Sequence, residues 1–151
     1  MTPPPLAPSG LVKDLTLSTK TSIAFNWLSV ADNAGESGGR VTGYRVYMAK
    51  DSDGAFLLAK DAKELRTLTN FMIDGLDTGR FYRFKVTAYN FNGEGAASAE
   101  LTTYACVAPS RMLAPLRVTS TSSPSFTIKW EAPDDDGGCP ITGYAVFRND
   151  G

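Results

Sequence analysis

The chain has 151 residues, a length that accommodates one or two domains. With 42% hydrophobic and 11% aromatic residues it can build a packed core, whereas a net charge of -1 supplies no field for binding nucleic acid or anionic lipid. The sequence contains no histidine, which excludes the Ser-His-Asp and Cys-His catalytic systems and the usual zinc sites. We therefore expect no catalytic residue, no metal site and no cofactor.

The first nine residues are rich in proline, and we expect a stiff linker over residues 1–9. This stretch lacks the basic start and the apolar core of a signal peptide. Its PxxP spacing, Pro5 to Pro8, has no flanking basic residue to orient it in an aromatic groove. No apolar run in the sequence approaches the roughly 18 residues that cross a bilayer, so we expect no membrane insertion of this segment.

Beyond the linker, apolar and polar residues alternate in short runs. Ile23, Phe25 and Trp27 stand on one side of their run, and the same period of two recurs over residues 44–48 and 82–88. Stretches rich in glycine and aspartate, such as KDSDG and DGLDTG, separate the runs. Short alternating strands at this spacing predict an antiparallel β-sandwich.

Residues 57–68 depart from this alternation. Leu57, Leu58, Leu65 and Leu68 stand at partly helical spacing, with good helix formers between them. Because pairing with neighbouring strands overrides local propensity, we predict a strand, a polar turn and another strand here, with a helical turn as the alternative.

The second half of the chain repeats the first. RVTGYRV at residues 40–46 returns as PITGYAV at residues 140–146, and IAFNW at residues 23–27 returns as FTIKW at residues 126–130. Because the matching runs occur in the same order, the repeat predicts two units of one fold.

These runs resemble fibronectin type III domains. The most specific piece is GLDTGRFYRFKVTAYNFNGEGAAS, residues 75–98, in which a leucine and a tyrosine six residues later precede an alternating strand and a glycine-rich loop. The resemblance implies an all-β, immunoglobulin-like antiparallel β-sandwich over residues 10–105, called module 1. It also implies that residues 106–151, called the C-terminal segment, form the first three strands of a second, incomplete module. We expect further strands, from the same chain or another, to cover the apolar face of that segment.

The resemblance also assigns core positions. Leu76 and Tyr82 are expected to form the tyrosine corner of the family, with the Tyr82 hydroxyl bonded to the backbone. The core residues expected to define the fold in the two units are Trp27, Tyr44, Leu76, Tyr82, Trp130 and Tyr144.

One loop is a candidate interaction site by its position. Some members of the family carry an integrin-binding Arg-Gly-Asp triplet in the loop that corresponds to NFNGEG, but this sequence lacks the triplet. We expect Phe91, at the tip, to fold onto its own loop, with an exposed anchor as the alternative. The candidate interaction loop consists of Asn90, Phe91, Asn92, Gly93 and Glu94.

Three other motifs are interpreted as ordinary turns. GEGAAS, residues 93–98, leads into an alternating strand rather than the helix that a phosphate loop requires. DSDG, residues 51–54, lacks the glutamate that a calcium loop carries at its twelfth position. We expect Asp134, Asp135 and Asp136 to form a solvated acidic loop, with calcium binding at the module junction, near Glu131, as the alternative.

The two cysteines carry more information. In the fold implied by the resemblance, Cys106 at the module start and Cys139 in the loop between the second and third strands lie at one pole. The matching positions in module 1 are Pro5 and Gly39, so both cysteines are missing there together. We predict a Cys106–Cys139 disulfide, with free buried thiols as the alternative. A disulfide indicates an oxidising location.

The resemblance implies a non-catalytic structural or adhesive tandem-repeat module of a larger cell-surface or extracellular fibre-forming protein. Such a module acts as a spacer and a protein-interaction surface. Its partners are proteins, including neighbouring modules of the same chain or adjacent copies, and not nucleic acid. A glycan ligand is not indicated. The alternatives are an intracellular cytoskeletal or ciliary scaffold array, and an accessory module of a larger secreted enzyme.

Overall fold

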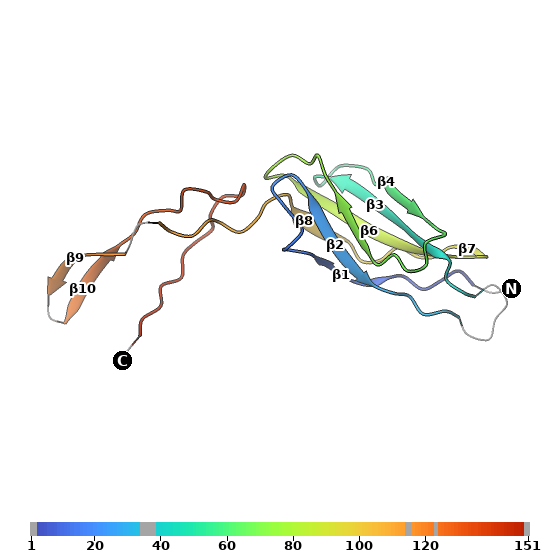
Figure 1. Ribbon diagram of the computed structural model, residues 1–151, viewed down its shortest axis with the longest axis horizontal. Coiled ribbons are helices and arrows are strands. Elements are labelled where there is room, and N and C mark those ends of the chain that lie inside the picture. The colour runs from blue at the N-terminus through green and yellow to red at the C-terminus, as the bar shows by residue number, and fades with distance from the viewer. Residues whose placement is uncertain (1–2, 34–38, 114–115, 123, 150–151) are drawn as a thin grey trace.

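The computed structural model describes residues 3–33, 39–113, 116–122 and 124–149. Module 1 is a β-sandwich, and the C-terminal segment extends from one of its ends (Figure 1). The strands of module 1 are β1 (Ser9–Lys13), β2 (Ile23–Leu28), β3 (Gly43–Lys50), β4 (Leu57–Ala62), β5 (Asn70–Ile73), β6 (Phe81–Asn90), β7 (Gly93–Glu94) and β8 (Leu101–Tyr104). The C-terminal segment contains β9 (Arg117–Ser122) and β10 (Ser125–Lys129). The predicted all-β fold is confirmed.

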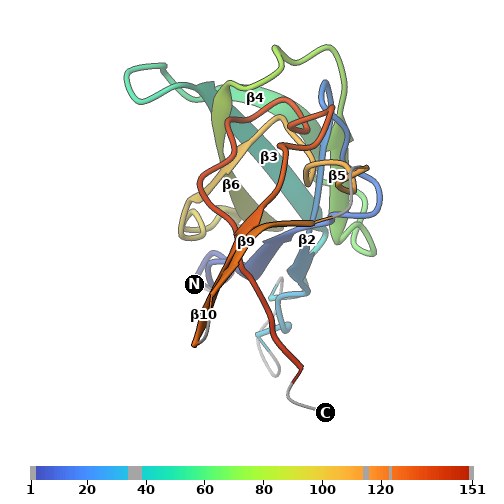
Figure 2. The ribbon, with the colours of Figure 1, turned by 90° about the vertical axis from the view of Figure 1, so that its left-hand side faces the viewer.

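Module 1 consists of two antiparallel sheets. One sheet has the order β1-β2-β5, and the other has the order β4-β3-β6-β7, with β8 also pairing with β6. Figure 2 looks along the long axis of the molecule, with β9 and β10 toward the viewer and the sheets of module 1 behind them. The central pair is β3 with β6, in a register that runs without a break from Gly43 opposite Tyr89 to Lys50 opposite Tyr82.

The leucine-rich stretch 57–68 begins with a strand, as predicted. β4 pairs with β3, a turn follows in which Leu65 N–H donates to the Ala62 carbonyl at 2.9 Å, and β5 pairs with β2. Sheet pairing therefore overrides the partly helical spacing of the leucines. Within the described ranges the chain has no helix, so none there is long and apolar enough to cross a membrane.

The core of module 1 lies between its two sheets. Phe25 is fully buried, and its ring centroid lies 4.8 Å from that of Phe84, 5.8 Å from that of Trp27 and 5.9 Å from that of Phe71. The rings are tilted or edge-on, as the charge distribution of aromatic faces favours. The buried cluster comprises Ile23, Phe25, Trp27, Val41, Tyr44, Val46, Leu76, Tyr82, Phe84, Val86, Ala88 and Ala105.

Both buried tyrosines of the core satisfy their hydroxyl groups. The Tyr82 hydroxyl accepts a hydrogen bond from the Asp77 backbone N–H at 2.9 Å, next to buried Leu76, in the tyrosine-corner arrangement. The Tyr44 hydroxyl accepts one from the Val30 backbone N–H at 3.0 Å. Trp27 differs, because its buried Nε1 has no hydrogen-bond partner among the described residues. Its contribution to stability therefore comes from packing.

The C-terminal segment forms two of its three predicted strands. β9 and β10 pair as an antiparallel hairpin, but residues 140–149 form no strand, which corrects the prediction. The counterpart of this stretch in module 1 is β3, whose ladder partners are β4 and β6. The described part of the C-terminal segment contains no counterpart of either strand, so no strand there is available to form a ladder with this stretch.

Several large apolar side chains in the described part of the C-terminal segment are exposed, among them Phe126, Val146 and Phe147. Trp130 and Tyr144 pack edge to face at 5.7 Å, the separation of Trp27 and Tyr44 in module 1. Tyr144 is nevertheless 47% exposed, whereas Tyr44 is 1% exposed. The strands that we expected to cover this apolar face are absent from the described residues. The described part of the C-terminal segment contains only the two-stranded sheet of β9 and β10.

We expect Trp27→Ala to destabilise module 1 by about 3–5 kcal/mol, since it removes the largest side chain of the core. Trp27→Phe keeps most of the packing and forfeits no hydrogen bond, so its effect should be smaller. Leu15→Ala, at a side chain that is 79% exposed, is the matched control and should change the free energy of unfolding by less than about 0.5 kcal/mol. Urea unfolding followed by circular dichroism measures all three. A loss below about 1 kcal/mol for Trp27→Ala would contradict the assigned core.

Candidate functional site

The candidate interaction loop is held by one buried side chain. Asn90, the last residue of β6, is 4% exposed, and its Nδ2 donates to the Pro3 carbonyl at 3.0 Å. Its Oδ1 accepts a hydrogen bond from the Asn92 backbone N–H at 2.8 Å. Gly93 follows with a φ of 122°, a value that side-chain-bearing residues rarely adopt. The loop is therefore fastened to the N-terminal linker, and the turn into β7 depends on glycine.

Phe91 is largely exposed, whereas we expected it to fold onto its own loop. Its side chain is 79% exposed. The strand alternation explains the error: Asn90 takes the inward direction to reach Pro3, which leaves the outward direction to the next residue. Aromatic side chains are enriched at the centres of protein–protein interfaces.

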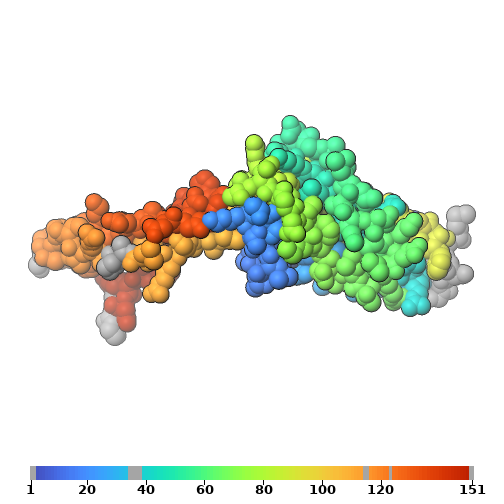
Figure 3. Space-filling model, turned by 45° about the horizontal axis from the view of Figure 1, so that its top comes forward, coloured from blue at the N-terminus to red at the C-terminus, as the bar shows by residue number. Residues whose placement is uncertain are grey.

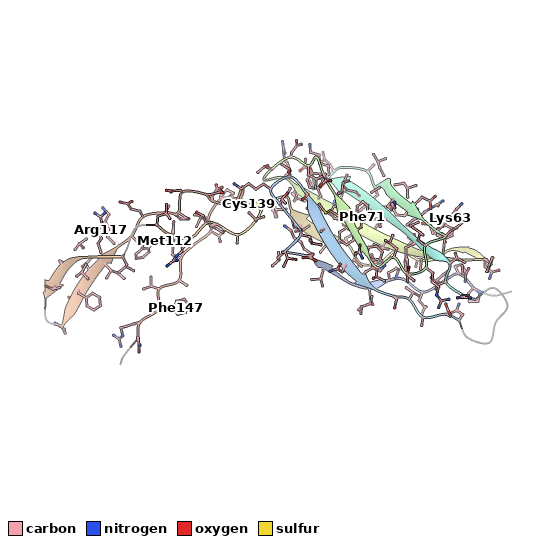
Figure 4. All side chains as sticks on the ribbon, viewed as in Figure 1. Lys63, Phe71, Met112, Arg117, Cys139 and Phe147 are labelled. Atoms are coloured by element: carbon pink, nitrogen blue, oxygen red, sulfur yellow. A yellow bond between two sulfur atoms is a disulfide. The ribbon has the colours of Figure 1, made fainter. Side chains whose placement is uncertain are left out.

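Phe91 also lines a groove at the same end of the sandwich. The cavity has a volume of about 560 Å³ and is lined by Arg40, Val41, Thr42, Lys63, Glu64, Arg66, Tyr89, Asn90 and Phe91. Three of these side chains are cationic, and only Arg66 among them forms an ion pair in the described structure, with Asp32 at 2.9 Å. Figure 4 shows Lys63 toward the end of the sandwich that lies away from Cys139. The groove therefore suits a partner that carries both acidic and apolar groups.

Sequence reasoning identified the loop but missed the groove. Its lining residues come from the stretch just before β3, the turn after β4, and the end of β6 with the residue that follows it, which are far apart in the sequence. The exposed charges Lys63 and Arg66 lie in the ambiguous stretch 57–68, where the pattern carried no functional signal. Only the pairing of β3 with both β4 and β6 brings them together.

Glu94, the last residue of the candidate loop, is the centre of a polar network on the outer face of the larger sheet. Its Oε1 accepts hydrogen bonds from the Tyr47 hydroxyl and the Thr87 hydroxyl, both at 2.6 Å. Its Oε2 accepts one from the Tyr89 hydroxyl at 3.0 Å and lies 3.5 Å from the Arg45 guanidinium. The network ties β7 to β3 and β6, so Glu94 has a structural role in addition to its place in the loop.

The hydrogen bonds of this network control the charge of Glu94. Burial alone would raise the pKa of its carboxyl group, because it disfavours the charged form. The hydrogen bonds from Thr87, Tyr47 and Tyr89, together with the charge of Arg45, outweigh burial and hold the pKa of Glu94 below its ordinary value. The carboxylate form is therefore the one that the folded state prefers.

The predicted disulfide between Cys106 and Cys139 is present. The two sulfurs are 2.17 Å apart and the Cα atoms are 5.8 Å apart, and neither cysteine is free. The bridge fastens the linker after β8 to the acidic loop that follows β10, at the end of module 1 (Figure 4). In module 1 itself the corresponding residues, Pro5 and Gly39, cannot form such a bridge.

The acidic loop is solvated but also forms a contact with module 1, which our expectation did not include. Asp135 forms an ion pair with Lys20 of module 1 at 2.6 Å. The expectation did not include this contact because the partner lies 115 positions away in the sequence. Across the described ranges of the chain, no group of three or more histidine, cysteine, aspartate or glutamate side chains is placed to hold a metal ion.

Two antiparallel sheets packed around a buried tryptophan, with a tyrosine corner, define an immunoglobulin-like β-sandwich module. The sequence profile of the fibronectin type III domain matches residues 7–104. The chain belongs to the fibronectin type III family.

Similar proteins have diverse contexts. The chain is 31% identical to Exoglucanase B of Cellulomonas fimi over 94% of its own length, and 27% identical to Titin of Drosophila melanogaster over 88%. The match spans only 13% of the first protein and 1% of the second. Among solved structures, the third fibronectin III domain of a human protein is similar with a TM-score of 0.53 and 20% identity, covering 71% of this chain and 86% of that domain. This last likeness shows the fold alone.

We expect Glu94→Gln to make module 1 less sensitive to acid. The folded-state pKa of Glu94 lies below its ordinary value of 4.5, so its contribution to stability is present above that value and is lost as the pH falls through the folded-state pKa. The free energy of unfolding should therefore fall less steeply below about pH 5 in the variant than in the parent chain.

The matched control is Glu64→Gln, at an exposed carboxylate that has no hydrogen bond or ion pair in the described part of the chain. Urea unfolding at a series of pH values between neutral and strongly acidic measures the slopes. Identical slopes for Glu94→Gln and the parent would show that the network does not stabilise the carboxylate.

Proposed function

We propose that this chain serves as a non-catalytic structural and adhesive module of a larger protein, acting both as a spacer and as a protein-interaction surface. The observation that supports this function is the difference in structure between the two ends of module 1. One end is fastened to the C-terminal segment through the disulfide-bridged linker and loop. The other carries exposed Phe91 beside a groove lined by cationic side chains.

The spacer role follows from the short connection between the units. Seen as a surface, the C-terminal segment continues outward from one end of module 1 (Figure 3). Figure 3 also shows blue atoms of module 1 against red atoms of the segment. Between the two units, Lys20 forms an ion pair with Asp135 at 2.6 Å. A short linker with such contacts limits the relative motion of neighbouring units, as a fibre or an extended array requires.

We place the protein at a cell surface or in the extracellular space. Disulfides persist in oxidising compartments and are rare in the cytosol, so the Cys106–Cys139 bridge supports this location. The similarity to titin supports the intracellular alternative, a scaffold array, but the bridge counts against it.

A second candidate function is that of an accessory module in a larger secreted enzyme. The supporting observation is the 31% identity to Exoglucanase B, which extends over 94% of this chain. An accessory role is compatible with the same location and with the same free groove, but its partner would be a substrate polymer or a catalytic domain.

The thiol state of the native protein tests the proposed location. Living source cells are treated with a membrane-permeant alkylating agent before lysis, and peptides that contain Cys106 and Cys139 are then identified by mass spectrometry. We expect a bridged peptide pair without alkylation. Two alkylated cysteines in most molecules would favour the intracellular scaffold.

Binding to an insoluble polymer separates the adhesive module from the enzyme accessory. The oxidised chain is incubated with microcrystalline cellulose and, separately, with chitin, and the depletion of protein from the supernatant is measured. We expect no depletion beyond that of bovine serum albumin. Depletion that disappears in Phe91→Ala, with the far-ultraviolet circular dichroism unchanged, would instead support the accessory function.

A further inference from the structure

We propose that the Cys106–Cys139 disulfide is a redox-controlled lock on the joint between module 1 and the C-terminal segment. The joint consists of the linker at residues 104–110 and the acidic loop at residues 134–139. In the oxidised form the bridge holds the loop against both the linker and the end of module 1. In the reduced form the joint loosens while module 1 stays folded.

The linker begins as a fixed part of module 1. Lys13 of β1 donates from its Nζ to the carbonyl of Tyr104 at 2.7 Å and to the carbonyl of Cys106 at 3.0 Å. Ala105, between them, is fully buried, and its N–H donates to the Arg80 carbonyl at 2.9 Å. Cys106 is therefore anchored to the sandwich before the C-terminal segment begins.

The loop then pairs with the linker through the backbone. The Val107 N–H donates to the Gly137 carbonyl at 2.9 Å, and the Ser110 N–H donates to the Asp135 carbonyl at 2.8 Å. The Asp135 N–H in turn donates to the Ser110 hydroxyl at 3.2 Å. The Cys106–Cys139 bridge lies beside this short ladder and fixes its register.

The same loop also touches module 1. A β-carbon added to Gly138 would lie 2.6 Å from Cγ2 of Thr78, and one added to Gly79 would lie 2.8 Å from the Gly138 carbonyl oxygen. Gly138 has a φ of 92°, in the region that glycine adopts without strain. The ion pair of Lys20 with Asp135 lies next to this contact. Only glycine at these positions allows the two backbones to approach so closely.

The bridge is the contact that decides whether the joint stays closed. The side chains of Lys20 and Asp135 are 41% and 48% exposed, and ion pairs of such exposure contribute little to stability. The backbone hydrogen bonds of the linker lie near the surface, where water competes for both partners. The bridge, by contrast, closes a loop between residues separated by 33 positions and removes most of the freedom of the open state.

The switching step is a thiol–disulfide exchange with a reductant of the dithiol class. One thiolate of the reductant attacks a sulfur of the bridge, which releases one cysteine thiolate and forms a mixed disulfide. The second thiolate of the reductant then releases the other cysteine. In sum, the bridge gains two electrons and two protons to give two thiols, and the dithiol is oxidised to a cyclic disulfide.

Amide hydrogen exchange of the full chain tests this proposal. Exchange is measured in the oxidised chain, in the chain reduced with dithiothreitol, and in the Cys106→Ser, Cys139→Ser double variant. We expect the N–H groups of Val107 and Ser110 to exchange at least about tenfold faster in the reduced chain and in the double variant, because the joint opens more often. The amides of β3 and β6 should be unaffected and show that module 1 is folded.

Lys20→Met is the matched variant, because it removes the ion pair and leaves the bridge. We expect the exchange rates of the same two amides to change less than about threefold in this variant, because an exposed ion pair contributes little to stability.

Three results would overturn the proposal. The amides of Val107 and Ser110 exchange equally in the oxidised and reduced chains; Lys20→Met loosens them as much as reduction does; or reduction accelerates β9, β10 and the joint to the same extent, so that the bridge stabilises the whole C-terminal segment and not the joint.

Discussion

The structure of this chain depends on the pairing of β3 with β6. Their unbroken register places Tyr44 and Val46 on the inner face, toward the aromatic cluster that β2 supplies. The same register places Arg45, Tyr47 and Tyr89 on the outer face, where Glu94 collects their hydrogen bonds. Since the two faces of a strand alternate, a slip of one residue would bury the polar set and expose the apolar set. The core and the outer network therefore result from one set of backbone contacts.

The C-terminal segment shows what happens when a stretch equivalent to β3 has no strand to pair with. Its alternating residues match those of module 1, and Trp130 still packs on Tyr144 as Trp27 packs on Tyr44. The stretch that corresponds to β3 nevertheless forms no strand, and Phe126 and Val146 stay more than half exposed. A local aromatic contact can form from neighbouring runs alone. A strand needs ladder partners, and in this fold those partners come from later in the module.

The two ends of module 1 are built by different means and suit different tasks. The end that meets the C-terminal segment relies on covalent closure, close backbone approach and glycine, which together define an orientation. The opposite end offers an exposed aromatic side chain and charges around a groove, which leave a partner undefined but accessible. Both ends adjoin β6: the groove is lined by Tyr89 and Asn90 at the end of this strand, and at the other end the Ala105 N–H donates to the Arg80 carbonyl just before it.

The sequence by itself determined the fold class, the strand alternation around Trp27 and Tyr82, and the two-unit repeat, because these follow from side-chain periodicity. The family resemblance added the Cys106–Cys139 pairing. The groove, the network of Glu94, the outward direction of Phe91 and the contact of Lys20 with Asp135 were decided by the tertiary structure alone. Each of these features depends on residues that are far apart in the sequence. Sheet register and the joint bring those residues together, and no local sequence pattern encodes such distant contacts.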